Sequence, residues 1–147
     1  MVSPFLDEAL VNLFIQLFLM ALTVVQEAGG KGYNGMLGVA WVLHRRQIAF
    51  KKSLTDVQFQ AYQFSAWLTG SATLMNIDQI SDALFFTALK ACIAAVYELE
   101  SDPTNSADHY LNEQATRAGR PNHDLPNWFE EEKVTARIGA HTFLKLL

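Results

Sequence analysis

The longest apolar run of the chain lies near its beginning, over residues 9 to 25, with the sequence ALVNLFIQLFLMALTVV. This run predicts a helix, and the residues before it provide a start signal. Ser3 can cap the helix, Pro4 suits its first position, and two acids, Asp7 and Glu8, suit the positive end of its dipole. The pattern therefore predicts a long first helix that begins within the first few residues.

This first helix is expected to end at about Ala28, because Gly29 and Gly30 follow it and offer a left-handed stop. It is apolar on nearly every side, which is typical of a helix surrounded by other elements. We therefore predict a central, solvent-poor core helix. One stripe of its surface recurs every four residues and is formed by Phe14, Phe18 and Leu22.

The same run can be interpreted as a signal peptide or a membrane anchor. Against this interpretation, the preceding residues contain no lysine or arginine, so a positive leader segment is missing. Asn12, Gln16 and Thr23 also interrupt a run that is short for a bilayer span of about 20 residues. We therefore expect a core helix, with no signal peptide and no stable membrane insertion.

Further along the chain, the pattern predicts two more helices. Asn34 can cap a helix over residues 35 to 47. Residues 53 to 75 are mixed, with a short turn in which Thr55 and Gln58 resemble a capping box, followed by an irregular or strand-like stretch. Asn76 or Ser81 opens a long helix to about Leu99. Its inward positions are expected to be Leu84, Phe85, Ala88, Leu89, Cys92, Ala95 and Val96.

The end of the chain has a different period. After a break at Pro103, the tail KVTARIGAHTFLKLL alternates apolar and polar residues, which predicts a strand or a hairpin arm. No internal repeat or linker is evident. The whole chain, residues 1–147, is therefore predicted to be one α+β domain that is predominantly α-helical, with a small β element.

Composition narrows the function classes. Half of the 147 residues are apolar and 18% are charged, which fits a folded domain and not a disordered one. The net charge of −4 does not indicate a protein that binds nucleic acid. The two basic pairs, Arg45-Arg46 and Lys51-Lys52, are expected to be solvated. The single cysteine, Cys92, is expected to be reduced and buried in a helix. The histidines show no metal-ligand spacing, so neither a metal nor a cofactor is expected.

Candidate chemistry centres on Glu27, which follows the apolar run and precedes four glycines in seven residues, Gly29 to Gly35. An apolar wall penalises an ionised carboxylate and so favours a protonated glutamate that can act as an acid. Glycines let a bulky substrate approach the backbone. The alternative from position alone is an ordinary exposed glutamate in the last turn of a helix.

Four motifs decide between these alternatives: EAGGKGYNGMLGVAWVLHRR from Glu27, QFSAW from Gln63, DPTNSADHYLN from Asp102 and TARIGAHTF from Thr135. In this order they resemble the spore-cortex-lytic cell wall hydrolase family, whose members cleave the glycan strands of peptidoglycan. The resemblance covers residues 20 to 143. It differs from many relatives at Gly29, where they carry arginine, and at "NSAD" before His109.

The resemblance implies a lysozyme-like fold of the lytic transglycosylase type, with Glu27 as the catalytic residue. Glu27 is expected to protonate the glycosidic oxygen between N-acetylmuramic acid and N-acetylglucosamine. It then acts as the base while the muramic C6 hydroxyl attacks the anomeric carbon, which leaves a 1,6-anhydro product. An ordinary glycosidase would need a second carboxylate, for which Asp56, Asp102 and Asp108 are candidates; Asp102 before Pro103 more plausibly caps a turn.

The motifs also supply candidate substrate-binding residues. Hydrogen bonds to N-acetyl or hydroxyl groups are expected from Gln63, Ser65 and Asn112. Stacking on sugar faces is expected from Tyr33, Phe64, Trp67 and Tyr110, while His109 can bond a saccharide or orient Tyr110. Phe64 and Trp67 can equally be core residues, and His141 is interpreted as a core histidine.

These expectations amount to a peptidoglycan lytic transglycosylase that acts as a monomer on glycan strands. A compact catalytic domain indicates a bacteriophage endolysin that is made in the host cytoplasm and acts at the wall. Two alternatives stay open. One is a hydrolytic muramidase, and the other is a non-catalytic glycan-binding or virion structural module with the same fold.

Overall fold

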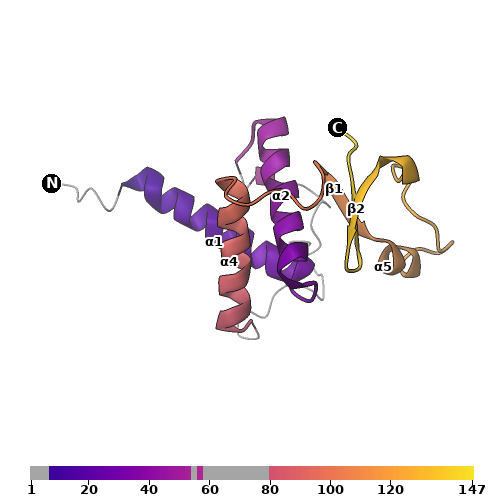
Figure 1. Cartoon of the computed structure of the whole chain (residues 1–147), viewed down its shortest axis with the longest axis horizontal. Helices are drawn as coiled ribbons and strands as arrows, with labels where there is room; N and C mark the ends of the chain where they lie inside the picture. Colours follow the sequence, from indigo (N-terminus) through magenta and orange to yellow (C-terminus); the bar gives the residue numbers. More distant parts are fainter. Residues whose placement is uncertain (1–6, 54–55, 58–79) are drawn as a thin grey trace.

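A computed structural model describes residues 7–53, 56–57 and 80–147 (Figure 1). Three long helices form one group, and a small sheet with a short helix lies on one side of it. In chain order the elements are α1 (Glu8–Ala28), α2 (Gly32–Phe50), α4 (Asp82–Val96), β1 (His109–Asn112), α5 (Glu113–Ala118), the 3-10 turn η4 (Glu131–Lys133), β2 (Val134–Ile138) and β3 (His141–Leu144). The predicted α+β architecture with a small β element is confirmed.

Helix α1 begins later than predicted. Asp7, and not Ser3, is its cap, because the Asp7 carboxylate accepts a hydrogen bond of 3.0 Å from the Ala9 amide. Its end also differs from the prediction, since Gly29 has right-handed backbone angles. The left-handed glycine is Gly32, with φ of 72°, which lets the chain turn directly into α2.

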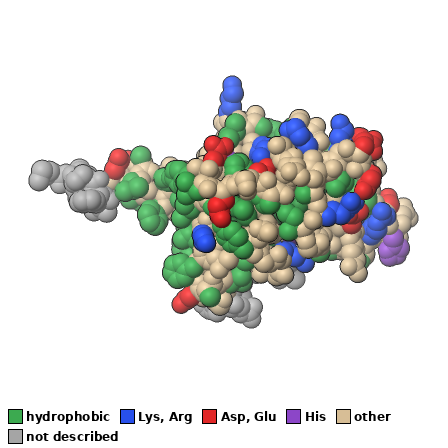
Figure 2. All heavy atoms as spheres, in the orientation of Figure 1, with side chains coloured by type: hydrophobic (Ala, Val, Ile, Leu, Met, Phe, Trp, Pro, Cys, Tyr) green, Lys and Arg blue, Asp and Glu red, His purple; other side chains and the backbone are tan. Residues whose placement is uncertain are grey.

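The two halves of α1 lie in different surroundings. From Leu17 onwards most side chains are buried, including Leu22 at 5% exposure. Phe14 and Phe18, by contrast, are 69% and 49% exposed, so their predicted burial is wrong. Figure 1 gives the reason, because α2 and α4 cross only the C-terminal half of α1 and the N-terminal half projects beyond them. Hydrophobic side chains accordingly cover this projection in Figure 2.

By length and composition alone, α1 could cross a membrane. Within its most apolar window, however, 39% of the residues are buried inside the protein. The buried residues belong to the C-terminal half, which packs against α2 and α4. In the folded protein this half therefore serves as a core helix, as predicted, while the N-terminal half does not.

Helix α2 is the central element of the core and contacts α1, α4 and β1. It begins at Gly32, so Asn34 lies inside the helix, and the predicted cap at Asn34 is wrong. Gly38 brings α2 close to the sheet, because a Cβ at this position would lie 2.8 Å from Cζ of Phe143. The Phe143 side chain of β3 is fully buried and thus joins the sheet to the helical core.

Helix α4 begins where the sequence predicts, because the Ser81 hydroxyl accepts a hydrogen bond of 3.1 Å from the Leu84 amide. It ends at Val96, three residues before Leu99. The small residues that it buries include Ala88, Cys92 and Ala95, as predicted. Burial raises the pKa of the Cys92 thiol, which agrees with an inert core cysteine.

The three strands form an antiparallel sheet in the order β1-β3-β2. The predicted hairpin is thus confirmed, with Gly139 at φ of 57° in the turn between β2 and β3. In register, Tyr110 of β1 pairs with Phe143 of β3. Strand β3 is therefore the middle strand, and it holds the other two against the helices.

The loop before β1 is tied to α2 by two arginines. Arg45 pairs with Asp102 at 2.5 Å, and Arg46 Nε donates a hydrogen bond of 2.7 Å to the Asp108 carbonyl. Arg46 is only 5% exposed, so the prediction of a solvated arginine pair is wrong. The reason lies outside the local sequence, since these partners belong to a loop more than 50 residues away.

Candidate active site

Glu27 lies in the last turn of α1 and is half-buried. Buried apolar residues, Val24 and Val25, precede it on the same helix. The carboxylate of Glu27 accepts a hydrogen bond from the Tyr110 hydroxyl, which reaches it from β1. The structure therefore joins two residues of different motifs that are more than 80 positions apart.

Tyr110 is held firmly in this position. Its hydroxyl oxygen is buried, and its ring lies 5.1 Å from that of His141 and 5.9 Å from that of Phe143. Burial, together with the charge of Glu27 and the hydrogen bond to it, raises the pKa of Tyr110 well above its usual value. The hydroxyl therefore stays protonated at neutral pH and donates a hydrogen bond to the carboxylate.

We call the region around Glu27 and Tyr110 the corner, and it also includes His141 and Lys31. His141, on β3, is 5% exposed, and burial followed by the charge of Lys31 lowers its pKa to about 4. The imidazole is therefore neutral at neutral pH. The interpretation of His141 as a core histidine agrees with this burial, but its neighbours place it beside the Glu27–Tyr110 pair.

Arg46, on α2, also lies beside Tyr110 in this corner. Burial lowers the pKa of its guanidinium, while the nearby Tyr110 and Asp108 act in the opposite direction. Its hydrogen bond to the Asp108 carbonyl fixes the chain directly before His109 and Tyr110. Arg46 thus anchors the start of β1, which carries the tyrosine.

His109 faces away from this corner, because successive side chains of a strand point to opposite sides of a sheet. Its Nδ1 lies 2.8 Å from the Asp108 carboxylate, and its ring lies 5.5 Å from that of Trp128. Burial is the main cause that lowers the pKa of His109, and Asp108 opposes it. The structure therefore does not bring His109 together with Glu27.

The remaining predicted binding residues are dispersed or outside the described part of the chain. Tyr33 contacts the α4 side, where its hydroxyl bonds Glu100 and its ring lies 5.2 Å from Nζ of Lys90. Asn112 caps α5 by accepting a hydrogen bond of 3.0 Å from the Ala115 amide. Four further predicted residues, Gln63, Phe64, Ser65 and Trp67, lie outside the described residues.

Two of the three candidate second carboxylates serve the fold. Asp102 accepts hydrogen bonds from Arg45, Thr104 and the Ser106 amide, which confirms the predicted turn cap. Asp108 is 1% exposed and accepts bonds from the amides of Leu146 and Leu147. The third, Asp56, is exposed in a short helical turn that follows Ser53. Among the described residues, no cluster of His, Cys, Asp or Glu could hold a metal ion.

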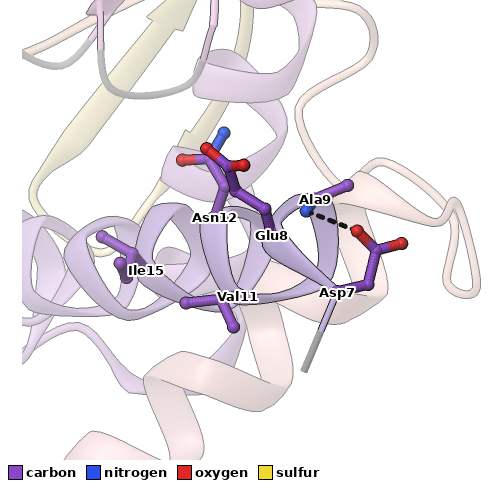
Figure 3. A pocket seen from close by; sticks show the side chains of 6 residues that line it. All are labelled: Asp7, Glu8, Ala9, Val11, Asn12 and Ile15. Carbon is purple, nitrogen blue, oxygen red and sulfur yellow. Dashed lines mark hydrogen bonds between the residues drawn. The ribbon is translucent and has the colours of Figure 1, made fainter. Parts of the chain in front are cut away.

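A hollow of about 720 Å³ lies elsewhere, beside the first turns of α1 (Figure 3). Val11, Asn12 and Ile15 line it together with the acids at the start of the helix, Asp7 and Glu8. At 1.5 Å per residue, this hollow is roughly 18 Å along the helix from Glu27. It is therefore separate from the corner that contains Glu27.

Sequence reasoning identified Glu27 and Tyr110 as separate candidates but did not identify their direct contact. It also did not single out Lys31 or Arg46 for this corner. A lysine four positions after a candidate acid, among glycines, is a signal that could have identified Lys31. Arg46 gave no local signal, because its role depends on the loop that precedes β1.

Comparisons with known proteins give a consistent result. A family model described as Cell Wall Hydrolase matches residues 30–144. Among solved structures, the catalytic domain of Bacillus cereus SleB is similar with 28% sequence identity and a TM-score of 0.64, covering 88% of this chain and 89% of that one. No curated protein matches.

A second solved structure, the catalytic domain of the germination-specific lytic transglycosylase SleB from Bacillus anthracis, is 25% identical with a TM-score of 0.64. It covers 98% of this chain and 100% of the other chain. The predicted lysozyme-like fold is thereby confirmed. The family match begins three residues after Glu27, so it does not include this residue.

Proposed function

The chain belongs to the cell wall hydrolase family, and on this premise we propose that it is a peptidoglycan lytic transglycosylase with Glu27 as its general acid and base. At the coarser level, it is an enzyme that degrades peptidoglycan. The bond that we propose it to cleave joins N-acetylmuramic acid to N-acetylglucosamine.

One observation carries the assignment of Glu27. Its carboxylate lies at the end of the buried C-terminal half of α1 and receives a hydrogen bond from the buried Tyr110 hydroxyl. A hydroxyl that donates to a carboxylate orients it and stabilises its charged form. This arrangement supports a carboxyl group that gives up a proton, becomes an anion and is then protonated again.

The proposed reaction has two proton transfers. Glu27 first donates its proton to the glycosidic oxygen, so that the bond from this oxygen to the muramic C1 breaks and the N-acetylglucosamine side leaves as an alcohol. The resulting carboxylate then accepts the proton of the muramic C6 hydroxyl while its oxygen bonds C1. The product is a 1,6-anhydro sugar, and Glu27 ends protonated, ready for the next cycle.

The other carboxylates favour this mechanism over one with two acids. An ordinary glycosidase needs a second carboxyl group at roughly 5 to 9.5 Å from the first. Asp102 and Asp108, two of the three candidates, are already engaged by the fold through Arg45 and the amides of Leu146 and Leu147. A nucleophile supplied by the sugar removes the need for such a partner.

The Glu27→Gln variant tests the catalytic role. Glutamine preserves the shape and can still accept a hydrogen bond from Tyr110, but it cannot transfer the proton. We expect turnover on purified cell walls to fall by at least the ~10² to 10⁴ that is typical of acid–base groups. The assignment fails if the folded variant, checked by circular dichroism, clears walls at the rate of the wild type.

Mass spectrometry of the digested walls tests the type of reaction. Anhydro-muropeptides support the transglycosylase, whereas reducing ends identify a muramidase that adds water. A digest without products indicates a glycan-binding or virion structural module. The three hypotheses drawn from the sequence are thus separated in one experiment.

Several finer predictions rest on the sequence alone. They include substrate contacts by Gln63, Phe64, Ser65 and Trp67, a single catalytic domain over residues 1–147, and action as a monomer. The bacteriophage origin, with synthesis in the host cytoplasm, also stays a prediction. The solved structures that resemble this chain come from Bacillus.

A further inference from the structure

Lys31 lies in the turn between α1 and α2, four residues after Glu27, and its amide bonds the Ala28 carbonyl. It differs from the other lysines of the chain because it is half-buried, whereas the other five are exposed. A lysine is usually half-buried because its aliphatic stem packs against other residues, because its ammonium group interacts with another group, or for both reasons.

The stem of Lys31 is packed between two glycines. A Cβ at Gly35, in the first turn of α2, would lie 2.5 Å from Cβ of Lys31. On the other side, a Cβ at Gly139 would lie 3.6 Å from Cδ of Lys31. The side chain therefore runs from α2 across the turn between β2 and β3, and its direction is restricted along most of its length.

Among the residues that the structure describes, the charge of Lys31 has no acidic partner, because none of their ion pairs involves it. Its neighbour His141 is neutral, and the rings of His141 and Tyr110 lie 5.1 Å apart. Tyr110 in turn donates a hydrogen bond to Glu27. A positioned cation is therefore available in the same corner as the proposed catalytic acid.

The proposed substrate carries matching charges at the corresponding place. Muramic acid bears a lactyl substituent at C3 of the same ring whose C1 is attacked. The lactyl group ends in a carboxylate, or in a stem peptide that has carboxylates of its own. A group that recognises this substituent must lie within about one sugar ring of the catalytic acid.

We propose that Lys31 forms a carboxylate-binding subsite beside Glu27 that recognises the acidic substituent of the muramic acid residue at the cleavage point. This inference rests on the proposed function, because it assumes that Glu27 acts on peptidoglycan. It adds a reason for the enzyme to prefer muramic acid strands over neutral chitooligosaccharides of the same length.

The test compares Lys31→Met with Lys31→Arg. Methionine preserves an unbranched stem that can pack against Gly139 but removes the charge, whereas arginine retains the charge. Lys52→Met is the matched control, because Lys52 is exposed beyond the end of α2. Thermal melts of all variants report whether the fold is intact.

Each variant is assayed on intact peptidoglycan and on the same material after its carboxylates are converted to neutral methylamides with carbodiimide. On intact walls, we expect Lys31→Met to lower kcat/KM roughly three- to tenfold, the range for a partly exposed charged contact. On neutralised walls it should equal the wild type. Lys31→Arg and Lys52→Met should resemble the wild type on both substrates.

Amidase-stripped strands identify the source of the carboxylate. They retain the lactyl carboxylate and lack the peptide. A persisting difference between Lys31→Met and the wild type assigns the contact to the lactyl group, and a lost difference assigns it to the stem peptide. Both results support the subsite.

Two results overturn the subsite: activity of Lys31→Met equal to the wild type on intact walls, or an equal loss on intact and neutralised walls. The second result would mean that Lys31 acts on Glu27 and not on the substrate. Co-sedimentation of Glu27→Gln with intact and neutralised walls, with and without Lys31→Met, measures the same contact without turnover. Failure of the catalytic proposal is therefore distinguishable from failure of the subsite.

Discussion

Replacing Tyr110 with phenylalanine removes one hydroxyl group and leaves the ring. The ring contacts of 5.1 Å to His141 and 5.9 Å to Phe143 can persist, so the strand should stay in place. What is lost is the hydrogen bond to the Glu27 carboxylate. A hydrogen bond to a charged group contributes about 1.5 to 3 kcal/mol.

This loss should appear in kcat and not in KM. In the mechanism that we propose, Glu27 is protonated when substrate binds and becomes a carboxylate as the glycosidic bond breaks. The hydroxyl would then stabilise the transition state more than the bound complex. At 1.36 kcal/mol per factor of ten, we expect kcat to fall about 10- to 150-fold. The buried hydroxyl cannot touch the sugar, so KM should stay within about twofold of the wild type.

The sign of the pH effect follows from the same contact. A donor to the carboxylate favours its charged form, so without the donor Glu27 stays protonated to higher pH. The alkaline limb of the activity profile should therefore move upward in the variant. The assay is the initial rate of release of soluble fragments from purified walls across the pH range.

Tyr97→Phe is the matched control, because Tyr97 is exposed at the end of α4. The reasoning is refuted if Tyr110→Phe raises KM and leaves kcat unchanged, since Tyr110 would then bind the substrate, as the sequence predicts. An unaltered pH profile together with a normal kcat would equally show that the hydroxyl does not support the carboxylate.

Three further predictions concern the fold. Leu22→Ala should cost about 2 to 5 kcal/mol in the free energy of unfolding, while Phe14→Ala, at a 69% exposed site, should stay within about 0.5 kcal/mol in urea titrations. Gly38→Ala should lower the melting temperature, because a Cβ 2.8 Å from Phe143 costs about 1 to 3 kcal/mol and outweighs a helix-propensity gain of about 1 kcal/mol. A higher melting temperature would mean that the Phe143 ring moves to make room for the new methyl group. The free energy of unfolding of the wild type should fall by up to about 3 kcal/mol as pH falls from 6.5 to about 4, because His141 takes up a proton in the unfolded state before it does so in the folded state. The free energy of unfolding of His141→Phe should depend less on pH over this range.

The sequence predicted those features that depend on neighbours along the chain. The Ser81 cap of α4 and the strands of the tail were predicted because the required chemistry lies within a few residues. The exposure of Phe14 could not be predicted in the same way. Periodicity reports that a helix is apolar, but it does not report how far the helices packed against it extend.

Prediction of the candidate active site from the local sequence pattern has the same limit. Glu27 was recognisable from the motif that begins with it, whereas its contact with Tyr110 requires the strand order β1-β3-β2. Burial of Arg46 depends on the loop around Asp108, which no local pattern connects to α2. Long-range pairing of this kind is set by packing of the complete domain, and the sequence pattern gives only the candidates.

The order of the strands in the sheet has a consequence for synthesis. Strand β3 is the last strand to leave the ribosome, yet it lies between β1 and β2 and carries Phe143 into the core. Until it emerges, β1 has no partner, and nothing holds Tyr110 against Glu27.

Roughly 120 residues separate the synthesis of Glu27 from that of the end of β3, which takes about 6 to 24 s at ~5–20 residues per second. During this interval the nascent chain contains Glu27 without its contact to Tyr110. Under the proposed mechanism, the growing chain therefore becomes active only when the middle strand is inserted and Tyr110 contacts Glu27.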